Sequence, residues 1–289
     1  GLKPGQDAGD WRDSPQGLDG GTYPYDVNVA LVPAALRAIA SLNASGLLTP
    51  YQSAADRRLL EGAGSQCNVW TRAAPPLFRV HINAARAAAD VQRYARSVNI
   101  APAAPLAALH GQAVDFPALA LDASGRPLPV MHSDEVFALV YGRPGVRQIS
   151  VALDTLMRPF PAGLMTPVGF VVADPVYAGP VAQRRFSRQD YHGTVIWGWP
   201  EAALAAGLTR QLHRKDLPPR LRMRLARARK QLWHMISAAS AYRGVELWSW
   251  ADLGGRFHIE PFRPRAGEAE ADAAQLWSTV SLALAPPGH

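Results

Sequence analysis

Hydrophobic residues recur at helical spacing through most of the chain. Alanine, leucine and valine dominate the segment 27–42, and Asp26 stands before it as a candidate N-cap. In the segment 218–242 the apolar residues fall on one helical face, and most of the arginines fall on the opposite, solvated face. The same periodicity predicts about eight helices, at 27–42, 52–60, 78–97, 133–141, 146–157, 201–214, 218–242 and 271–283.

One β-hairpin interrupts this helical pattern. Two apolar runs, Ala118–Leu121 and Arg126–Val130, flank the turn sequence Asp-Ala-Ser-Gly. Pairs of helices joined by loops favour an all-α architecture, an (α/α)6 toroid with this small β-hairpin insertion, over a βαβ sheet. Because a closed toroid needs more helices than the pattern provides, we expect residues 1–289 to form one catalytic-type domain, the C-terminal part of a larger barrel.

Composition is that of a globular protein, with 48% hydrophobic residues and no apolar run of about 18 residues that would predict a membrane span. The N-terminus has no signal-peptide pattern. Cys67 is the single cysteine, which excludes an internal disulfide and a cysteine-based zinc cluster. It fits a reducing compartment such as the cytoplasm and does not exclude the periplasm.

The net charge of +7 raises the question of nucleic acid. Most of the excess lies between Arg210 and Lys230, where no aromatic residues interleave as stacking platforms. These arginines are typical of a solvated helix face, and we expect no nucleic-acid partner.

Candidate catalytic residues lie in loops between the predicted helices. Asp13 follows Trp11 and Arg12, which have opposite effects on a carboxyl pKa: an apolar wall raises it and a cation lowers it. Glu246 stands between apolar and aromatic residues, unlike a glutamate in a solvated turn. Each acid alone is also explained by a structural ion pair. Together they supply the two carboxyls that glycoside hydrolysis requires.

The segment from Tyr191 to Trp199 contains His192, Trp197 and Trp199 and opens a predicted helix. Aromatic faces stack on sugar rings, and polar groups such as His bond sugar hydroxyls. A buried aromatic cluster with a hydrogen-bonded histidine explains the segment equally well. Gln275, in Ala-Gln-Leu-Trp-Ser at the start of the last predicted helix, either faces the same site or belongs to a network at that helix terminus.

Five motifs in this order resemble the C-terminal amylo-α-1,6-glucosidase domain of glycogen debranching enzymes and its bacterial relatives, which are six-hairpin toroid glycosidases. They span residues 9–279 and comprise Trp11-Arg12-Asp13 followed by Tyr23 to Asn28, Gly163 to Thr166 followed by Asp174 to Tyr177, Tyr191 to Trp199, the Glu246 loop, and Ala274 to Ser278. The chain departs from the family pattern at three places. Val245 replaces a serine, Gly198 replaces a proline, and Leu247 to Trp250 replace the Phe-Asp-Gly that follows the glutamate in the family.

This resemblance implies an inverting glucosidase of carbohydrate metabolism that acts on α-linked glucose in an oligo- or polysaccharide. Asp13 would protonate the leaving oxygen and Glu246 would activate water, with the carboxyls roughly 6.5–9.5 Å apart. Neither a metal nor another cofactor is expected. The candidate substrate-binding residues are Trp11, Arg12, Asn28, Tyr191, His192, Trp197, Trp199, Trp248 and Gln275.

Two alternatives stay open. A related toroid glycosidase would cleave trehalose, mannosides or another oligosaccharide. A non-catalytic carbohydrate-binding protein would keep the binding residues without turnover, an outcome also expected if this chain is an inactive fragment. The missing N-terminal part of the barrel is a candidate partner under either reading.

Overall fold

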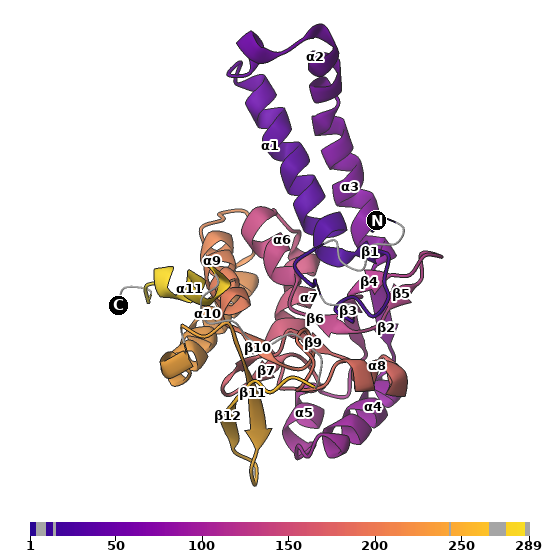
Figure 1. Cartoon of the computed structure of the whole chain (residues 1–289), viewed down its shortest axis with the longest axis vertical. Helices are drawn as coiled ribbons and strands as arrows, with labels where there is room; N and C mark the ends of the chain where they lie inside the picture. Colours follow the sequence, from indigo (N-terminus) through magenta and orange to yellow (C-terminus); the bar gives the residue numbers. More distant parts are fainter. Residues whose placement is uncertain (4–9, 14–15, 243, 266–275, 287–289) are drawn as a thin grey trace.

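The computed structural model describes residues 1–3, 10–13, 16–242, 244–265 and 276–286. It has a body of helices and short strands, from which a long helical hairpin projects (Figure 1). The N-terminus lies near the base of this hairpin, and α11 lies on the other side of the body.

The projecting hairpin, which we call the arm, comprises η1 (Asp26–Leu31), α1 (Val32–Ala44), η2 (Thr49–Tyr51), α2 (Ala54–Glu61) and α3 (Ala63–Leu77). Its first helix starts as a π-helix and continues into α1 without a break. Pro33 accounts for this widened turn, since proline has no N–H to donate and its ring clashes with the carbonyl four residues earlier.

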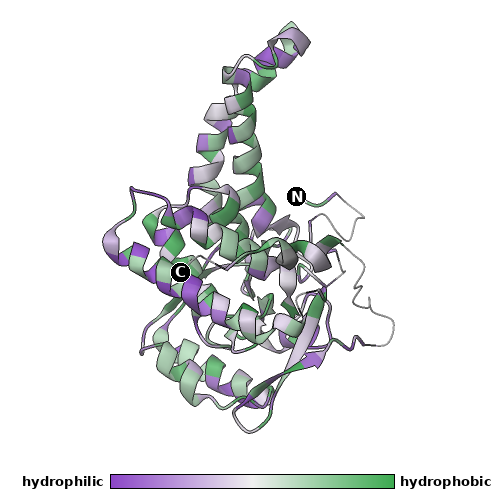
Figure 2. Ribbon diagram, turned by 90° about the vertical axis from the view of Figure 1, so that its left-hand side faces the viewer, coloured by the Kyte–Doolittle hydropathy of each residue, from purple (hydrophilic) through white to green (hydrophobic). Residues whose placement is uncertain are grey.

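Within the arm, α1 packs along α3, and both helices leave apolar side chains in solvent. Figure 2 shows hydrophobic residues continuing outward along the arm, away from the body. Its exposed large apolar residues are Leu42, Leu47, Tyr51, Leu59, Val69 and Leu77. The sequence shows no uninterrupted apolar run, yet the helix Asp26–Ala44 has the length and composition of a membrane-spanning segment, and 22% of its apolar window is buried. Core helices of soluble proteins share this length and composition, but most of their surface is buried.

In the body, α9 (Gly198–Leu212) lies at the centre of a helical layer, between α6 (Glu135–Tyr141) and α10 (Pro219–Ala238). Nearby, α10 also contacts α7 (Val146–Met157). The remaining helices are α4 (Ala84–Ser97), α5 (Ala103–Ala108), α8 (Gly179–Arg185), η3 (Ser240–Tyr242), α11 (Leu276–Thr279) and η4 (Val280–Ala283).

The strands pair in five small antiparallel sheets within the described residues. Two sheets have three strands: β1 (Tyr23–Pro24), β4 (Ala120–Leu121) and β5 (Pro127–Leu128) in one, and β10 (Ile196–Trp197), β11 (Leu247–Asp252) and β12 (Phe257–Pro261) in the other. Three sheets have two strands each: β2 (Arg79–Ile82) with β3 (Val114–Pro117), β6 (Met131–His132) with β9 (Ala173–Asp174), and β7 (Met165–Thr166) with β8 (Gly169–Phe170).

The expectation of an all-α toroid is wrong. About 51% of the described residues are helical and 14% are in strands, which form five small sheets. The physical reason lies in the loops: segments such as 247–252 are apolar and aromatic, and they bury their side chains by pairing as strands. The chain therefore has a mixed α and β architecture.

Most of the predicted helices are present, with shifted ends. The segment 146–157 matches α7, and the hairpin around residues 122–125 is confirmed by the pairing of β4 with β5. The prediction for 78–97 is wrong in its first part, where residues 79–82 alternate buried and exposed as strand β2. Of the segment 271–283, residues 271–275 lie outside the described residues. Helices α3, α5 and α8 were not predicted.

Gly207 allows α9 to approach α6. A Cβ atom at this position would lie 2.8 Å from the Cβ of Leu139, closer than side-chain atoms pack. We expect Gly207→Ala to lower the free energy of unfolding by about 1–3 kcal/mol, measured by urea denaturation. Gly64→Ala in α3 is the matched control, because its nearest neighbour would be 3.8 Å away, and it should gain up to about 1 kcal/mol. Equal effects of the two variants would contradict this packing account.

Candidate active site

Arg12 is the buried anchor of the N-terminal segment. Its side chain is 0% exposed, and its Nε and Nη2 donate to the Asp134 carboxylate at 2.9 and 2.7 Å. Nη2 also donates to the carbonyl oxygen of Val172 at 2.8 Å. This bidentate pair, the geometry in which arginine binds a carboxylate most strongly, fixes the segment that carries Trp11 and Asp13.

Trp11 connects this anchor to the aromatic residues of the Tyr191–Trp199 loop. Its Nε1 donates to Asp134 at 3.2 Å, and the Arg12 guanidinium lies over its ring at 4.3 Å. Three further rings pack edge-on around it: the centroids of His192, Trp197 and Trp199 lie 5.2, 5.6 and 4.8 Å away. Two segments about 180 residues apart in sequence thus form one aromatic cluster.

His192 is held inside this cluster. Its ring stacks on that of Trp197 with an interplanar angle of 8°, and it makes a hydrogen bond with the Trp11 backbone. Burial, assisted by the positive charge of Arg12, lowers the pKa of His192 well below its ordinary value. The imidazole is therefore neutral at neutral pH.

Strand pairing brings Glu246 to the same cluster. β10 pairs with β11, so that Trp197 lies opposite Leu247, and the Gly198 N–H donates to the carbonyl oxygen of Glu246. The hydroxyl of Tyr191 donates to Glu246 Oε1 at 2.8 Å. Glu246 is 0% exposed, so its carboxyl is enclosed by protein in this conformation.

Asp13 is the accessible acid of the site. Its side chain is 68% exposed, and its Oδ1 lies 3.7 Å from Nε2 of His192. From there the contacts continue through the rings of His192 and Tyr191, with centroids 4.9 Å apart, to Glu246. The two predicted catalytic acids therefore border one cluster, one acid at its solvent edge and one in its interior.

The other predicted substrate-binding residues are mostly buried. Asn28 donates from Nδ2 to the carbonyl oxygen of Pro24 at 2.7 Å, and Trp248 donates from Nε1 to that of Val168 at 3.1 Å. Trp199 is buried and contacts Trp277, which is 43% exposed. Gln275 lies outside the described residues. A cavity beside Trp248 has a volume of about 10 Å3, room for one water at most.

Sequence reasoning missed a group of buried carboxyls around Arg12. Burial and the negative charge of Asp134 raise the pKa of both Asp10 and Asp26, and the positive charge of Arg12 lowers the pKa of both. Burial first, and then the charges of Asp134 and Asp10, raise the pKa of Asp26 to about 8. The available signal was Asp134 and its neighbour Glu135, two acids at the start of an apolar helix.

Glu201 is a second missed acid, at the start of α9 just after Trp199. Burial raises its pKa to about 8, opposed by a hydrogen bond with the Phe170 backbone. It borders the small cavity beside Trp248. Within the described part of the chain, no group of three or more His, Cys, Asp or Glu side chains is arranged to hold a metal ion.

Comparison with known proteins adds no relative, since no protein-family profile and no curated protein matches this chain.

Removing the Arg12 charge should destabilise the fold strongly. In Arg12→Met the buried Asp134 carboxylate loses its bidentate partner, so we expect a loss of about 3–5 kcal/mol in the free energy of unfolding, measured by urea denaturation. Arg185→Met is the control: its ion pair with Asp19 also ties the N-terminal segment to the body, but the arginine is half exposed. That change should cost less than about 1 kcal/mol. A loss as small in Arg12→Met would show that the segment is held by other contacts.

Asp26 should make stability depend on pH. The folded protein keeps the Asp26 proton up to about pH 8, whereas the unfolded chain releases it near the ordinary pKa of 3.8. Between these values the folded state binds more protons, so stability falls as pH rises. In Asp26→Asn the fall between about pH 5 and 8 should be shallower, by up to about 1.4 kcal/mol per pH unit, in urea denaturation at several pH values. An unchanged slope, as expected for the exposed control Glu61→Gln, would refute the buried proton.

Proposed function

We propose that this protein is a glycoside hydrolase that cleaves α-linked glucose from an oligo- or polysaccharide with inversion. The observation that carries the proposal is the single cluster in which the Trp11–Asp13 segment, the Tyr191–Trp199 loop and Glu246 meet. Sugar cleavage requires two carboxyls, and the two in this cluster come from segments more than 200 residues apart.

In this mechanism Asp13 acts as the general acid. Its exposure allows it to reach the glycosidic oxygen of a bound sugar, and it gives that oxygen a proton as the bond to the anomeric carbon breaks. The exposed ring of Trp277, which packs on Trp199 at the edge of the cluster, provides an apolar face on which a sugar ring can stack. The neutral, buried His192 leaves the Asp13 carboxyl without a cationic partner on that side.

Glu246 acts as the general base. A water molecule adds to the anomeric carbon from the face opposite the leaving group, and Glu246 takes the proton that the water loses. Because the Tyr191 hydroxyl covers Oε1, this step requires the Tyr191 side chain to turn away when substrate binds. Tyr191 is therefore part of the proposed machinery.

The enclosure of Glu246 favours one second candidate, a carbohydrate-binding protein without turnover. Such a protein would use the exposed edge of the cluster, with Asp13 and Trp277, and would keep Glu246 as a structural partner of Tyr191. It would bind sugars and release no product.

Amide substitutions of the two acids test hydrolysis. Asp13→Asn cannot donate the proton and Glu246→Gln cannot accept one, so each should lower kcat on α-linked gluco-oligosaccharides by about a hundredfold to ten-thousandfold. Sugar affinity, measured by isothermal titration calorimetry, should change little. Product analysis on α-1,6 and α-1,4 glucosides, trehalose and mannosides identifies the substrate.

The matched controls are Asp154→Asn and Glu260→Gln, which lie outside the cluster and should keep full activity. Unchanged turnover in Asp13→Asn or Glu246→Gln would reject the assigned acids. Sugar binding by the unmodified protein with no product from any substrate of the panel would select the binding protein over the hydrolase.

A further inference from the structure

A cavity of about 480 Å3 opens on another side of the fold, between the end of α3, the β2–β3 sheet and α7. Pro75, Pro76, Pro117 and Val151 form its apolar walls. The volume is in the range of small-molecule sites, and apolar walls with a few polar groups are typical of such sites. None of the residues that we assign to sugar cleavage lines it.

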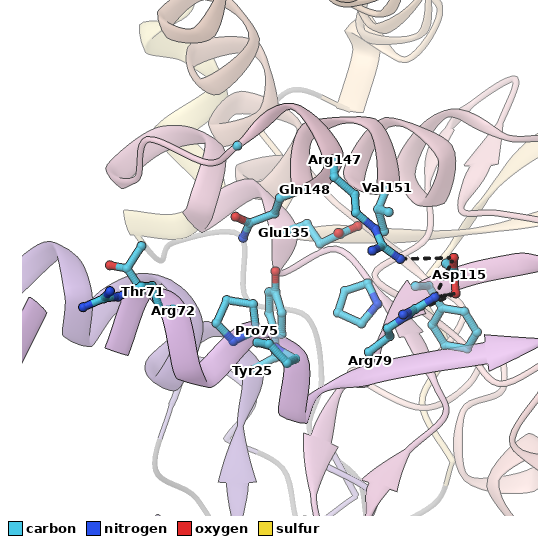
Figure 3. A pocket seen from close by; sticks show the side chains of 14 residues that line it. Tyr25, Thr71, Arg72, Pro75, Arg79, Asp115, Glu135, Arg147, Gln148 and Val151 are labelled. Atoms are coloured by element: carbon cyan, nitrogen blue, oxygen red, sulfur yellow. Dashed lines mark hydrogen bonds and ion pairs between the residues drawn. The ribbon is translucent and has the colours of Figure 1, made fainter. Parts of the chain in front are cut away.

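The charged residues of this cavity are mostly arginines. Arg72, Arg79 and Arg147 line it, together with Asp115. The Asp115 carboxylate lies 3.1 Å from Arg79 and 3.7 Å from Arg147, as Figure 3 shows, and 2.9 Å from His81. Arg72 has no carboxylate partner within the described residues, its Nε donating only to the carbonyl oxygen of Asn68. Three arginines against one aspartate make the cavity attractive to an anion.

Glu135 is a buried acid that the fold satisfies only in part: its carboxyl has a hydrogen bond with the Thr155 side chain, but one oxygen is left over. The residue is 2% exposed, it lines the cavity, and its Oε2 has no hydrogen-bond partner in the described part of the chain. Burial raises the pKa of Glu135 well above its ordinary value, which favours the protonated form, and a protonated carboxyl can both donate and accept a hydrogen bond. In Figure 3 the Tyr25 hydroxyl and the Gln148 amide, which bond to each other, lie close to it.

We infer that this cavity binds a small organic anion that carries a hydroxyl or amide group at the end of an apolar spacer. The anionic group binds the arginines, the spacer packs on the prolines and Val151, and the hydroxyl or amide satisfies Glu135. A buried polar atom without a partner is rare in proteins, and a ligand supplies the missing one. This inference is independent of the sugar-cleaving site, and it holds whether or not hydrolysis occurs.

The test uses the full chain and ω-hydroxycarboxylates of about four to eight carbons, a range that scans the length of the cavity. Isothermal titration calorimetry should show saturable binding of at least one acid of this series. The n-alkanoate of the same length lacks the hydroxyl, and the matched diol lacks the charge. Each of these two analogues should bind about tenfold more weakly than the hydroxy acid.

Variants separate the polar and the charged contacts. Glu135→Gln keeps a neutral donor and acceptor and should bind the acid within about threefold of the unmodified protein, whereas Glu135→Met should bind about tenfold more weakly. The double variant Arg72→Gln/Arg147→Gln should also lose about tenfold and most of the salt dependence. Arg143→Gln, whose arginine pairs with Asp216 outside the cavity, should bind normally.

Val151→Phe narrows the cavity while Glu135 and the arginines stay unsubstituted, and it should weaken binding, which keeps the test decisive if a Glu135 variant fails to fold. Two results would overturn the inference. One is that no acid of the series binds the folded protein. The other is that binding persists unchanged in both Glu135→Met and Val151→Phe, since the acid would then occupy another place.

Discussion

The buried ion pair between Arg12 and Asp134 is the interaction on which the candidate site depends. Two charges removed from water are stable only when they face each other with good geometry, and here one guanidinium meets the carboxylate twice and a backbone carbonyl once. The pair ties a short N-terminal segment with little secondary structure to the start of α6. It thereby places Trp11 against the Tyr191–Trp199 loop and leaves Asp13 at the solvent edge.

The acids of this region differ in how deeply they are buried and in which groups surround them. Asp13 is exposed to solvent, and Glu246 is enclosed under a tyrosine hydroxyl. Asp26 holds a proton up to about pH 8 because it is buried and lies beside the charges of Asp134 and Asp10. Carboxyls with such different surroundings are common where acid and base chemistry occur, although structural networks produce them too. The proposed assignment of acid and base therefore rests on the position of each group in the cluster.

Sequence periodicity predicted the long helices other than α3, and the β4–β5 hairpin, because their apolar residues repeat at regular intervals. It did not separate strand β2 from helix α4, since Arg79–Ile82 carries apolar residues at positions that also fit a helix. Pairing partners far along the chain, such as Trp197 and Leu247, decide the short strands, and no local pattern reveals them. Motif order predicted that Trp11, His192 and Glu246 belong together. It predicted that Arg12 binds substrate and could not predict its buried ion pair with Asp134, because the two residues are about 120 positions apart in sequence.

The stereochemistry of cleavage tests the central claim most directly, that Asp13 and Glu246 work as a pair across one glycosidic bond. Proton NMR of an α-linked glucoside during its first turnovers distinguishes the anomers of the released glucose before they interconvert. The account predicts that β-glucose appears first, because water enters opposite the leaving group. Release of α-glucose first, or of no glucose from any α-linked substrate, would contradict it.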